Sequence, residues 1–123
     1  MCEFYYSLAC EYSCKQYGKF LEEVINCEDA ILWHCSLGRD RCGVGTALLL
    51  TCLDVDRKNI IEDYVYTDEC LKGEDYYDGI DYRYLESYFK GVEDAYGSVI
   101  NMLDSVGINE DKINILKEKY LEK

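Results

Sequence analysis

Residues 30–50 read Ala-Ile-Leu-Trp-His-Cys-Ser-Leu-Gly-Arg-Asp-Arg-Cys-Gly-Val-Gly-Thr-Ala-Leu-Leu-Leu. The first four residues, 30–33, form an apolar run that is long enough for one buried strand. Residues 41–53 are apolar on nearly all sides, which predicts a helix buried in the core. Between these two elements, Cys35 and Arg41 enclose five residues at the predicted strand-to-helix turn.

This Cys-x5-Arg spacing has a chemical reason. The backbone N–H groups of such a loop can point into one bowl, and the helix N-terminus adds the positive end of its dipole. The guanidinium of Arg41 can hold two oxygens of a phosphate in this bowl. The same positive field favours the thiolate form of Cys35, a nucleophile aimed at phosphorus. Gly38 leaves room for a close approach of the backbone to the ligand.

The run His-Cys-Ser-Leu-Gly-Arg-Asp-Arg-Cys-Gly-Val-Gly (residues 34–45) resembles the signature loop of the cysteine-dependent tyrosine phosphatases. Within that superfamily it is similar to the atypical microbial tyrosine/phosphoinositide phosphatases, whose loop usually reads His-Cys-x-x-Gly-Lys-Asp-Arg-Thr-Gly. The resemblance continues through residues 47–50, 56–64 and 93–99, and so covers most of this chain but only the C-terminal half of the family's domain. It implies an α/β, mostly helical fold, in which about five or six helices surround a central strand and the phosphate loop.

The resemblance also implies roles for individual loop residues. Cys35 would be the nucleophile, Asp40 the general acid that protonates the leaving oxygen, and Arg41 the group that stabilises the phosphoryl oxygens. His34 would support the loop and the thiolate by hydrogen bonding. The residues expected to bind the phosphate are Ser36, Leu37, Gly38, Arg39, Asp40 and Arg41.

Three of these residues have simpler interpretations that the sequence leaves open. Asp40 could stabilise the helix only through the dipole, as acidic residues in a first turn do. Arg39, which stands where the family usually has lysine, could be a solvated side chain at the rim of the loop. His34 could be a purely structural residue. A zinc site built from His34, Cys35 and Cys42 has poor ligand spacing. The cysteine-based reaction that the resemblance implies needs neither a metal nor an organic cofactor.

Cys42 departs from the family, which has threonine or serine at this position. The hydroxyl there normally hydrogen-bonds the nucleophile and helps it leave the phosphocysteine intermediate. A thiol is a weaker hydrogen-bond donor, so we expect slower hydrolysis of that intermediate. Cys42 could also form a protective disulfide with an oxidised Cys35.

Composition predicts one domain, residues 1–123, with a modest core. The chain has 13 basic and 25 acidic residues and a formal net charge of −12. Such a charge repels nucleic acid, which we exclude as a partner. It also repels a phosphorylated ligand, so a phosphate site needs its own local positive field. Two of the four arginines, Arg39 and Arg41, lie in the loop.

The sequence also carries signals about location. No run of about 18 apolar residues occurs, so we expect no stable insertion in a membrane. The N-terminus lacks the basic region of a signal peptide. Most of the eight cysteines fall on apolar faces of helical patterns, where free cysteine behaves as a small hydrophobe. Because a thiolate nucleophile needs reducing surroundings, we expect free thiols and a cytoplasmic location.

The remaining segments are predicted to be helical. Residues 3–26 favour one helix or two, with a weak point at Gly18. Asp56, Ser98 and Asn109 are predicted N-caps of helices over 57–71, 99–106 and 110–121. The other predicted elements are a loop over 72–81, a helix over 82–96 with Leu85, Phe89, Val92 and Tyr96 on one face, and a helix end at Gly107.

One strand by itself leaves its N–H and C=O groups unpaired. The chain is therefore expected to be a fragment of a longer domain, to have a reduced sheet, or to pair with another chain that completes the sheet, as in a homo-oligomer.

The predicted function is a protein-tyrosine phosphatase that acts on a phosphotyrosine protein or another phosphomonoester through a cysteinyl-phosphate intermediate. Dual specificity and phosphoinositide activity are possible extensions. The alternative from another class is a catalytically weak or inactive phosphate-binding module, or a truncated remnant that requires a partner chain. The intact Cys35, Asp40 and Arg41 favour the enzyme, whereas Cys42 favours the alternative.

Overall fold

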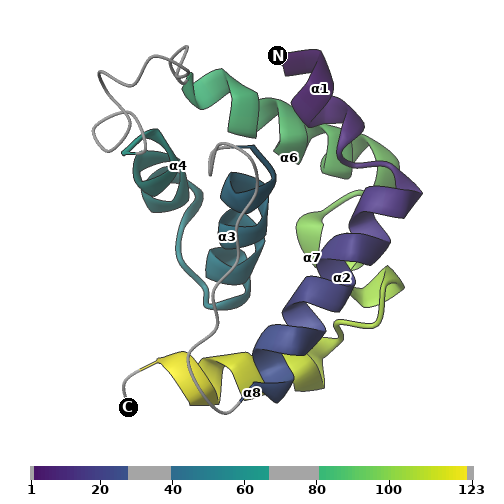
Figure 1. Cartoon of the computed structure of the whole chain (residues 1–123), viewed down its shortest axis with the longest axis vertical. Coiled ribbons are helices and arrows are strands. Elements are labelled where there is room, and N and C mark those ends of the chain that lie inside the picture. The colour runs from purple at the N-terminus through teal and green to yellow at the C-terminus, as the bar shows by residue number, and fades with distance from the viewer. Residues whose placement is uncertain (1, 28–39, 67–80, 122–123) are drawn as a thin grey trace.

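The computed structural model describes residues 2–27, 40–66 and 81–121 (Figure 1). These residues contain seven helices and no strand. The helices are α1 (Cys2–Ser7), α2 (Glu11–Asn26), α3 (Asp40–Cys52), α4 (Arg57–Val65), α6 (Tyr82–Tyr96), α7 (Val99–Ser105) and α8 (Glu110–Tyr120). The mostly helical fold is confirmed, with more helices than the five or six expected. The predicted strand over 30–33 lies outside the described residues.

Helix α3 lies in the middle of the other helices (Figure 1). It packs against α2, α4, α6 and α8. Its side chains explain this position, because Val44, Leu48 and Cys52 are completely buried and Ala47 is only 2% exposed. A helix that is apolar around its circumference is stable only when other elements cover it on several sides. The prediction of a core helix over 41–53 is confirmed to within one residue at each end.

The starts of the later helices are set by capping side chains, as predicted. Asp56 Oδ1 accepts a hydrogen bond from the Asn59 N–H at 2.8 Å and begins α4. Ser98 Oγ and Asn109 Oδ1 accept from N–H groups three residues further on, at 3.1 Å in both cases, and begin α7 and α8. Each cap satisfies one backbone donor that the helix itself cannot satisfy. The predicted glycine end is also confirmed, since Gly107 has φ +93° after α7.

Two predicted boundaries are wrong. The N-terminal segment breaks at residues 8–10 rather than at Gly18, which lies buried inside α2. A Cβ atom at Gly18 would lie 2.9 Å from Cγ2 of Val106, so the glycine allows α2 to pack closely on the end of α7. Helix α4 ends at Val65 rather than near residue 71, and the Tyr66 N–H bonds to the Glu62 carbonyl. Leu71 and the predicted loop over 72–80 lie outside the described residues.

A lysine of α8 caps the C-terminal end of α2. The ammonium of Lys119 donates hydrogen bonds to the carbonyl oxygens of Val24 at 3.0 Å and Ile25 at 3.3 Å, and also to that of Cys27. Carbonyls in the last turn of a helix have no partner within the helix and carry the negative end of its dipole. The cation of Lys119 therefore stabilises the end of α2 as well as lying in the last turn of its own helix.

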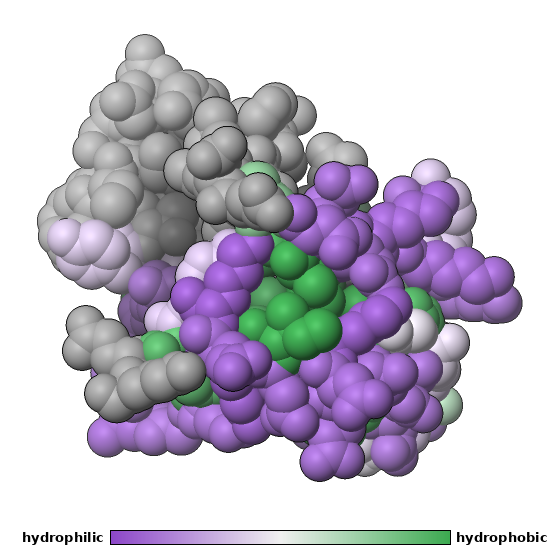
Figure 2. All heavy atoms as spheres, turned by 90° about the horizontal axis from the view of Figure 1, so that it is seen from below, coloured by the Kyte–Doolittle hydropathy of each residue, from purple (hydrophilic) through white to green (hydrophobic). Residues whose placement is uncertain are grey.

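The surface seen from the α8 end is mostly hydrophilic around a small apolar area (Figure 2). This agrees with the excess of acidic residues in the composition. Within the three described segments, no helix combines the length and the apolar character that a membrane span requires.

Candidate functional site

The start of α3 is the described part of the predicted phosphate site. The helix begins at Asp40, so the predicted loop residue Arg39 directly precedes its first turn. The N–H groups of a first helical turn have no carbonyl partner within the helix and carry the positive end of the dipole. An anion bound at this end is therefore stabilised.

Two glycines allow aromatic rings to approach the first turns of α3. A Cβ atom at Gly43 would lie 2.9 Å from Cε1 of Tyr64, which belongs to α4. A Cβ atom at Gly45 would lie 3.3 Å from Cε2 of Phe20, which belongs to α2. The two rings therefore pack directly on the helix backbone, one from each neighbouring helix. The segment Cys-Gly-Val-Gly after Arg41 thus positions the beginning of α3 between α2 and α4.

Tyr64 also belongs to a group of tyrosines that pack against one another. The hydroxyl groups of Tyr64 and Tyr5 are hydrogen-bonded at 2.6 Å, and their rings meet edge to face at 6.1 Å between centroids. The ring of Tyr5 stacks on that of Tyr84 at 5.6 Å. Tyr5 is completely buried and Tyr64 is 4% exposed. The group therefore connects α1, α4 and α6 beside the first turn of α3.

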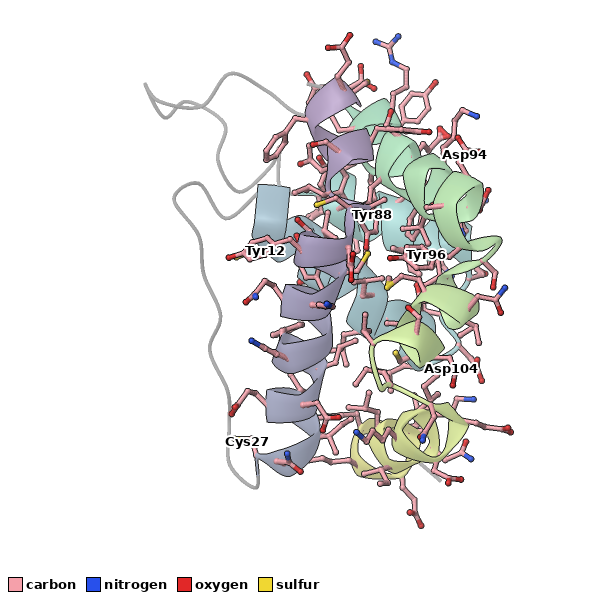
Figure 3. All side chains as sticks on the ribbon, turned by 90° about the vertical axis from the view of Figure 1, so that its right-hand side faces the viewer. Tyr12, Cys27, Tyr88, Asp94, Tyr96 and Asp104 are labelled. Atoms are coloured by element: carbon pink, nitrogen blue, oxygen red, sulfur yellow. The ribbon has the colours of Figure 1, made fainter. Side chains whose placement is uncertain are left out.

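Close packing of α1 on α6 places Tyr5 in this group. A Cβ atom at Gly91 of α6 would lie 2.7 Å from the carbonyl oxygen of Tyr6, so only glycine permits the observed approach. The Tyr6 hydroxyl donates to Asp94 Oδ2 at 2.9 Å and links the two helices at the surface. Figure 3 shows Asp94 on the outer side of α6.

A small recess lies between α3 and α4 beside this packing. Its volume is about 80 Å³. Ligand pockets usually have volumes of about 300–1,000 Å³, so the recess is too small to hold a substrate by itself. It brings the partly buried Cys42 to the same surface as Thr46 and Asp63. Its full lining is Cys42, Gly43, Thr46, Ala47, Leu50, Ile60, Asp63 and Tyr64.

The structure describes only part of the predicted site. His34, Cys35, Ser36, Leu37, Gly38 and Arg39 lie outside the described residues. Asp40 and Arg41 are described as the first two residues of α3, and their side chains lie outside the description. Cys42 is the predicted site residue whose side chain is placed, in the recess between α3 and α4.

Tyr5, Tyr64, Thr46 and Asp63 were not predicted from the sequence to lie near the site. Tyr64 is 4% exposed and belongs to the buried face of α4. A signal was present in the sequence, because glycines at positions 43 and 45 in a predicted core helix indicate close approach of a neighbouring element. The sequence could not show which aromatic rings make that approach.

The comparison with known families agrees with the loop motif. The sequence model of the tyrosine phosphatase family matches residues 1–122, nearly the whole chain. No curated protein matches the chain. The match extends over every described helix, so the likeness to this family is not confined to the loop. The chain belongs to the tyrosine phosphatase family.

Proposed function

We propose that this chain hydrolyses phosphomonoesters, and phosphotyrosine in proteins first among them, through a cysteinyl-phosphate on Cys35. The position of α3 carries the proposal. The helix begins at Asp40, five residues after Cys35, in a chain that belongs to the tyrosine phosphatase family. The amides of this first turn supply a positive field at the point where a phosphoryl group would bind.

In the first step, the thiolate of Cys35 attacks phosphorus and the bond from phosphorus to the ester oxygen breaks. Asp40 gives its proton to the leaving oxygen, so a neutral phenol departs from phosphotyrosine. The guanidinium of Arg41 and the loop amides stabilise the charge on the equatorial oxygens. For this role Asp40 must be protonated at the start, which requires a raised pKa.

In the second step, water attacks phosphorus and the phosphorus–sulfur bond breaks. Asp40 takes the proton from water, inorganic phosphate leaves, and the Cys35 thiolate is restored. A hydroxyl at position 42 would assist this departure by donating a hydrogen bond to the sulfur. Because Cys42 offers only a weak thiol donor, the second step is expected to limit turnover.

The partners of the other two arginines support the assignment of phosphate binding to the loop. Arg57 pairs with Glu93 at 3.4 Å and lies 3.8 Å above the ring of Phe89. Arg83 pairs with Asp81 at 2.6 Å. Both side chains therefore have structural partners on α6 or its N-cap. This supports the assignment of the phosphate-binding guanidinium to Arg39 and Arg41.

The state of other cysteines supports a reducing compartment such as the cytoplasm. Cys14 and Cys52 are buried free thiols. Burial raises the pKa of the Cys52 thiol to about 11. Buried thiols that stay reduced are in keeping with a nucleophilic thiolate that oxidation would inactivate.

Turnover of p-nitrophenyl phosphate by the purified chain in the presence of dithiothreitol tests the proposal. We expect Cys35→Ser and Arg41→Lys to lower kcat/KM by at least about a thousandfold, since each removes a group used in the transition state. Cys10→Ser and Arg83→Lys are matched controls and should keep the wild-type rate. A phosphotyrosine peptide, a phosphoserine peptide and a soluble phosphoinositide then rank the substrates.

Vanadate binding separates the enzyme from the alternative function. No turnover together with vanadate binding that requires Arg41 would replace the enzyme by a phosphate-binding module, which Cys42 favours. Equal turnover by the wild type and Cys35→Ser would contradict the proposal outright.

A further inference from the structure

A groove of about 380 Å³ lies where the C-terminal end of α3 meets α7 and α8. Its apolar lining consists of Cys52, Ile108 and Ile113, which are buried, and Ile100, which is 50% exposed. An isoleucine half exposed at the edge of a hollow is available for contact with another apolar group. The polar residues that line the groove are Thr51, Asp54, Asn101, Asp104, Asn109, Glu110, Asn114 and Lys117.

The charge of this groove is negative. Lys117 Nζ lies 2.7 Å from Asp54 Oδ2, so the one cation of the lining already has a carboxylate partner. Asp104 and Glu110 form no ion pair with any of the described residues. The groove therefore presents two uncompensated carboxylates above an apolar floor. Figure 3 shows Asp104 on the outer side of α7, near α8.

Two of the three carboxylates occupy positions that are unfavourable for the fold. Asp54 follows the last turn of α3, and Asp104 lies in the last turn of α7. The C-terminal end of a helix is the negative end of its dipole, where an acidic side chain is destabilising. Only Glu110, in the first turn of α8, has a favourable position for its own helix.

The backbone conformation of Asp54 is a second feature that lowers the stability of the fold. Its φ is +63°, and it is the only described residue other than glycine with a positive φ. The Val55 N–H bonds to the Leu50 carbonyl and the Asp54 N–H to the Thr51 carbonyl, both at 3.1 Å. In a helix end with these two bonds, the position of Asp54 is normally occupied by glycine. A carboxylate is thus kept at a place where both the backbone and the dipole disfavour it. Features that lower stability in this way cluster at binding sites.

The charge and shape of the groove decide between possible occupants. Within residues 2–27, 40–66 and 81–121, no group of three His, Cys, Asp or Glu side chains could hold a metal ion. Phosphates, nucleic acids and anionic lipids carry the wrong sign. A second copy of this chain would bring another formal charge of −12. A basic segment of a partner protein satisfies both the carboxylates and the apolar floor.

We infer that this groove docks a basic, amphipathic segment of a partner protein, with an aliphatic side chain on the floor and lysines or arginines facing Asp104 and Glu110. The groove lies at the opposite end of α3 from the predicted phosphate loop. A helix of this length spans about 20 Å, so docking and phosphate chemistry use separate surfaces. The inference therefore does not depend on the proposed function.

A pair of synthetic peptides tests the inference. One is a 16-residue helical peptide with leucines on one face and lysines on the other, and its matched control replaces every lysine with glutamate. Binding is followed by ¹H–¹⁵N correlation spectra of the labelled chain. We expect the lysine peptide to shift the amide signals of Ile100, Ile113 and Asn114, and the glutamate peptide to shift none of them.

Charge-matched variants locate the binding. Asp104→Lys combined with Glu110→Lys should weaken binding of the lysine peptide about tenfold or more, which corresponds to about 1.4 kcal/mol. Glu62→Lys combined with Glu86→Lys makes the same change of net charge elsewhere and should leave the affinity nearly unchanged. Ile100→Asp should weaken binding although it makes the chain more negative. Simple attraction between opposite charges predicts the reverse for this variant.

Three results would overturn the inference. The first is equal weakening by the two charge-reversal pairs, and the second is a set of shifted signals spread over the whole surface. The third is a concentration-dependent dimer in sedimentation experiments that Ile100→Asp abolishes, because it would assign the groove to a second copy of the chain.

Discussion

The hydroxyl oxygens of Tyr5 and Tyr64 lie 2.6 Å apart in the buried interior and join α1 to α4 across 59 positions of sequence. Their rings also pack edge to face, and the ring of Tyr64 touches Gly43 in the first turns of α3. The first turns of α3, which follow the predicted phosphate loop, therefore pack against residues from distant parts of the chain.

Removing this hydrogen bond should destabilise the fold. We expect Tyr64→Phe and Tyr5→Phe each to lower the free energy of unfolding by about 1–2 kcal/mol. The double variant should lose clearly less than the sum, since the two changes remove the same bond. Urea unfolding followed by circular dichroism measures all three variants. Strictly additive losses would show that the two hydroxyl groups are not energetically coupled.

Replacing Tyr88 with phenylalanine should instead raise the free energy of unfolding. The Tyr88 side chain is completely buried between α2 and α6 (Figure 3), and its hydroxyl has no hydrogen-bond partner among the described residues. Burial also raises the pKa of this phenol well above its usual value. Tyr88→Phe removes a buried polar atom and should raise the free energy of unfolding by about 1 kcal/mol. Tyr64→Phe, measured in the same way, is the control, and a similar loss in both variants would contradict this prediction.

Substitution of Gly43 should destabilise the fold because the new side chain would collide with Tyr64, not because of the backbone conformation of the glycine. Alanine is favoured over glycine inside a helix by about 1 kcal/mol, but the added Cβ would lie only 2.9 Å from the Tyr64 ring. We expect Gly43→Ala to lower the free energy of unfolding by about 1–3 kcal/mol, as overpacking does. In a Tyr64→Leu background the same change should be neutral or stabilising. Equal loss in both backgrounds would exclude the ring as the cause.

Cys42 should limit the second chemical step. Cys42→Thr supplies a hydroxyl donor beside the proposed leaving thiolate, and one such hydrogen bond corresponds to about a fivefold to tenfold gain in kcat. Stopped-flow assays with p-nitrophenyl phosphate should show a burst of nitrophenol in the wild type and a smaller burst in the variant. Cys52→Ser, a change in the core away from the loop, is the control. A variant with unchanged burst and kcat would show that hydrolysis of the intermediate is not limited by residue 42.

Asp81 should make the fold sensitive to acid. Hydrogen bonds from the side chain and backbone N–H of Arg83 lower the pKa of the Asp81 carboxyl to about 2. The pKa is lower in the folded state than in the unfolded chain. The stabilisation is therefore fully present above about pH 4 and is lost as the pH falls toward 2. Asparagine keeps a capping oxygen but cannot titrate, so Asp81→Asn should lower the urea midpoint at pH 5 and have little effect near pH 2.

A charge-matched control accompanies this pH series. Glu86→Gln removes a negative charge from an exposed position on the same helix. Its urea midpoint should run parallel to that of the wild type between pH 5 and pH 2. A difference between wild type and Asp81→Asn that stays constant over this range would show that the Asp81 carboxyl is not the titrating group.

Local signals in the sequence determined most helix boundaries. The predicted starts at Arg57, Tyr82, Val99 and Glu110 agree with the structure, because a capping side chain satisfies backbone donors in its own neighbourhood. The end predicted at residue 26 also agrees with α2, whereas the break at residues 8–10 and the packing at Gly18 were not predicted. The packing of Val106 on Gly18 and the capping of α2 by Lys119 join residues more than 85 positions apart, which no local signal shows.

The sequence by itself also determined the family, because the Cys-x5-Arg motif and its flanking segments are local patterns, and the family model matches residues 1–122. It further determined that α3 is a core helix, because its apolar residues surround the helix axis. Only the tertiary structure decided what positions that helix and what remains exposed. The contacts of Tyr64 with Tyr5 and Gly43, and the acidic groove at the other end of α3, join residues from separate helices. Such contacts arise from the packing of many side chains at once, which no local pattern specifies.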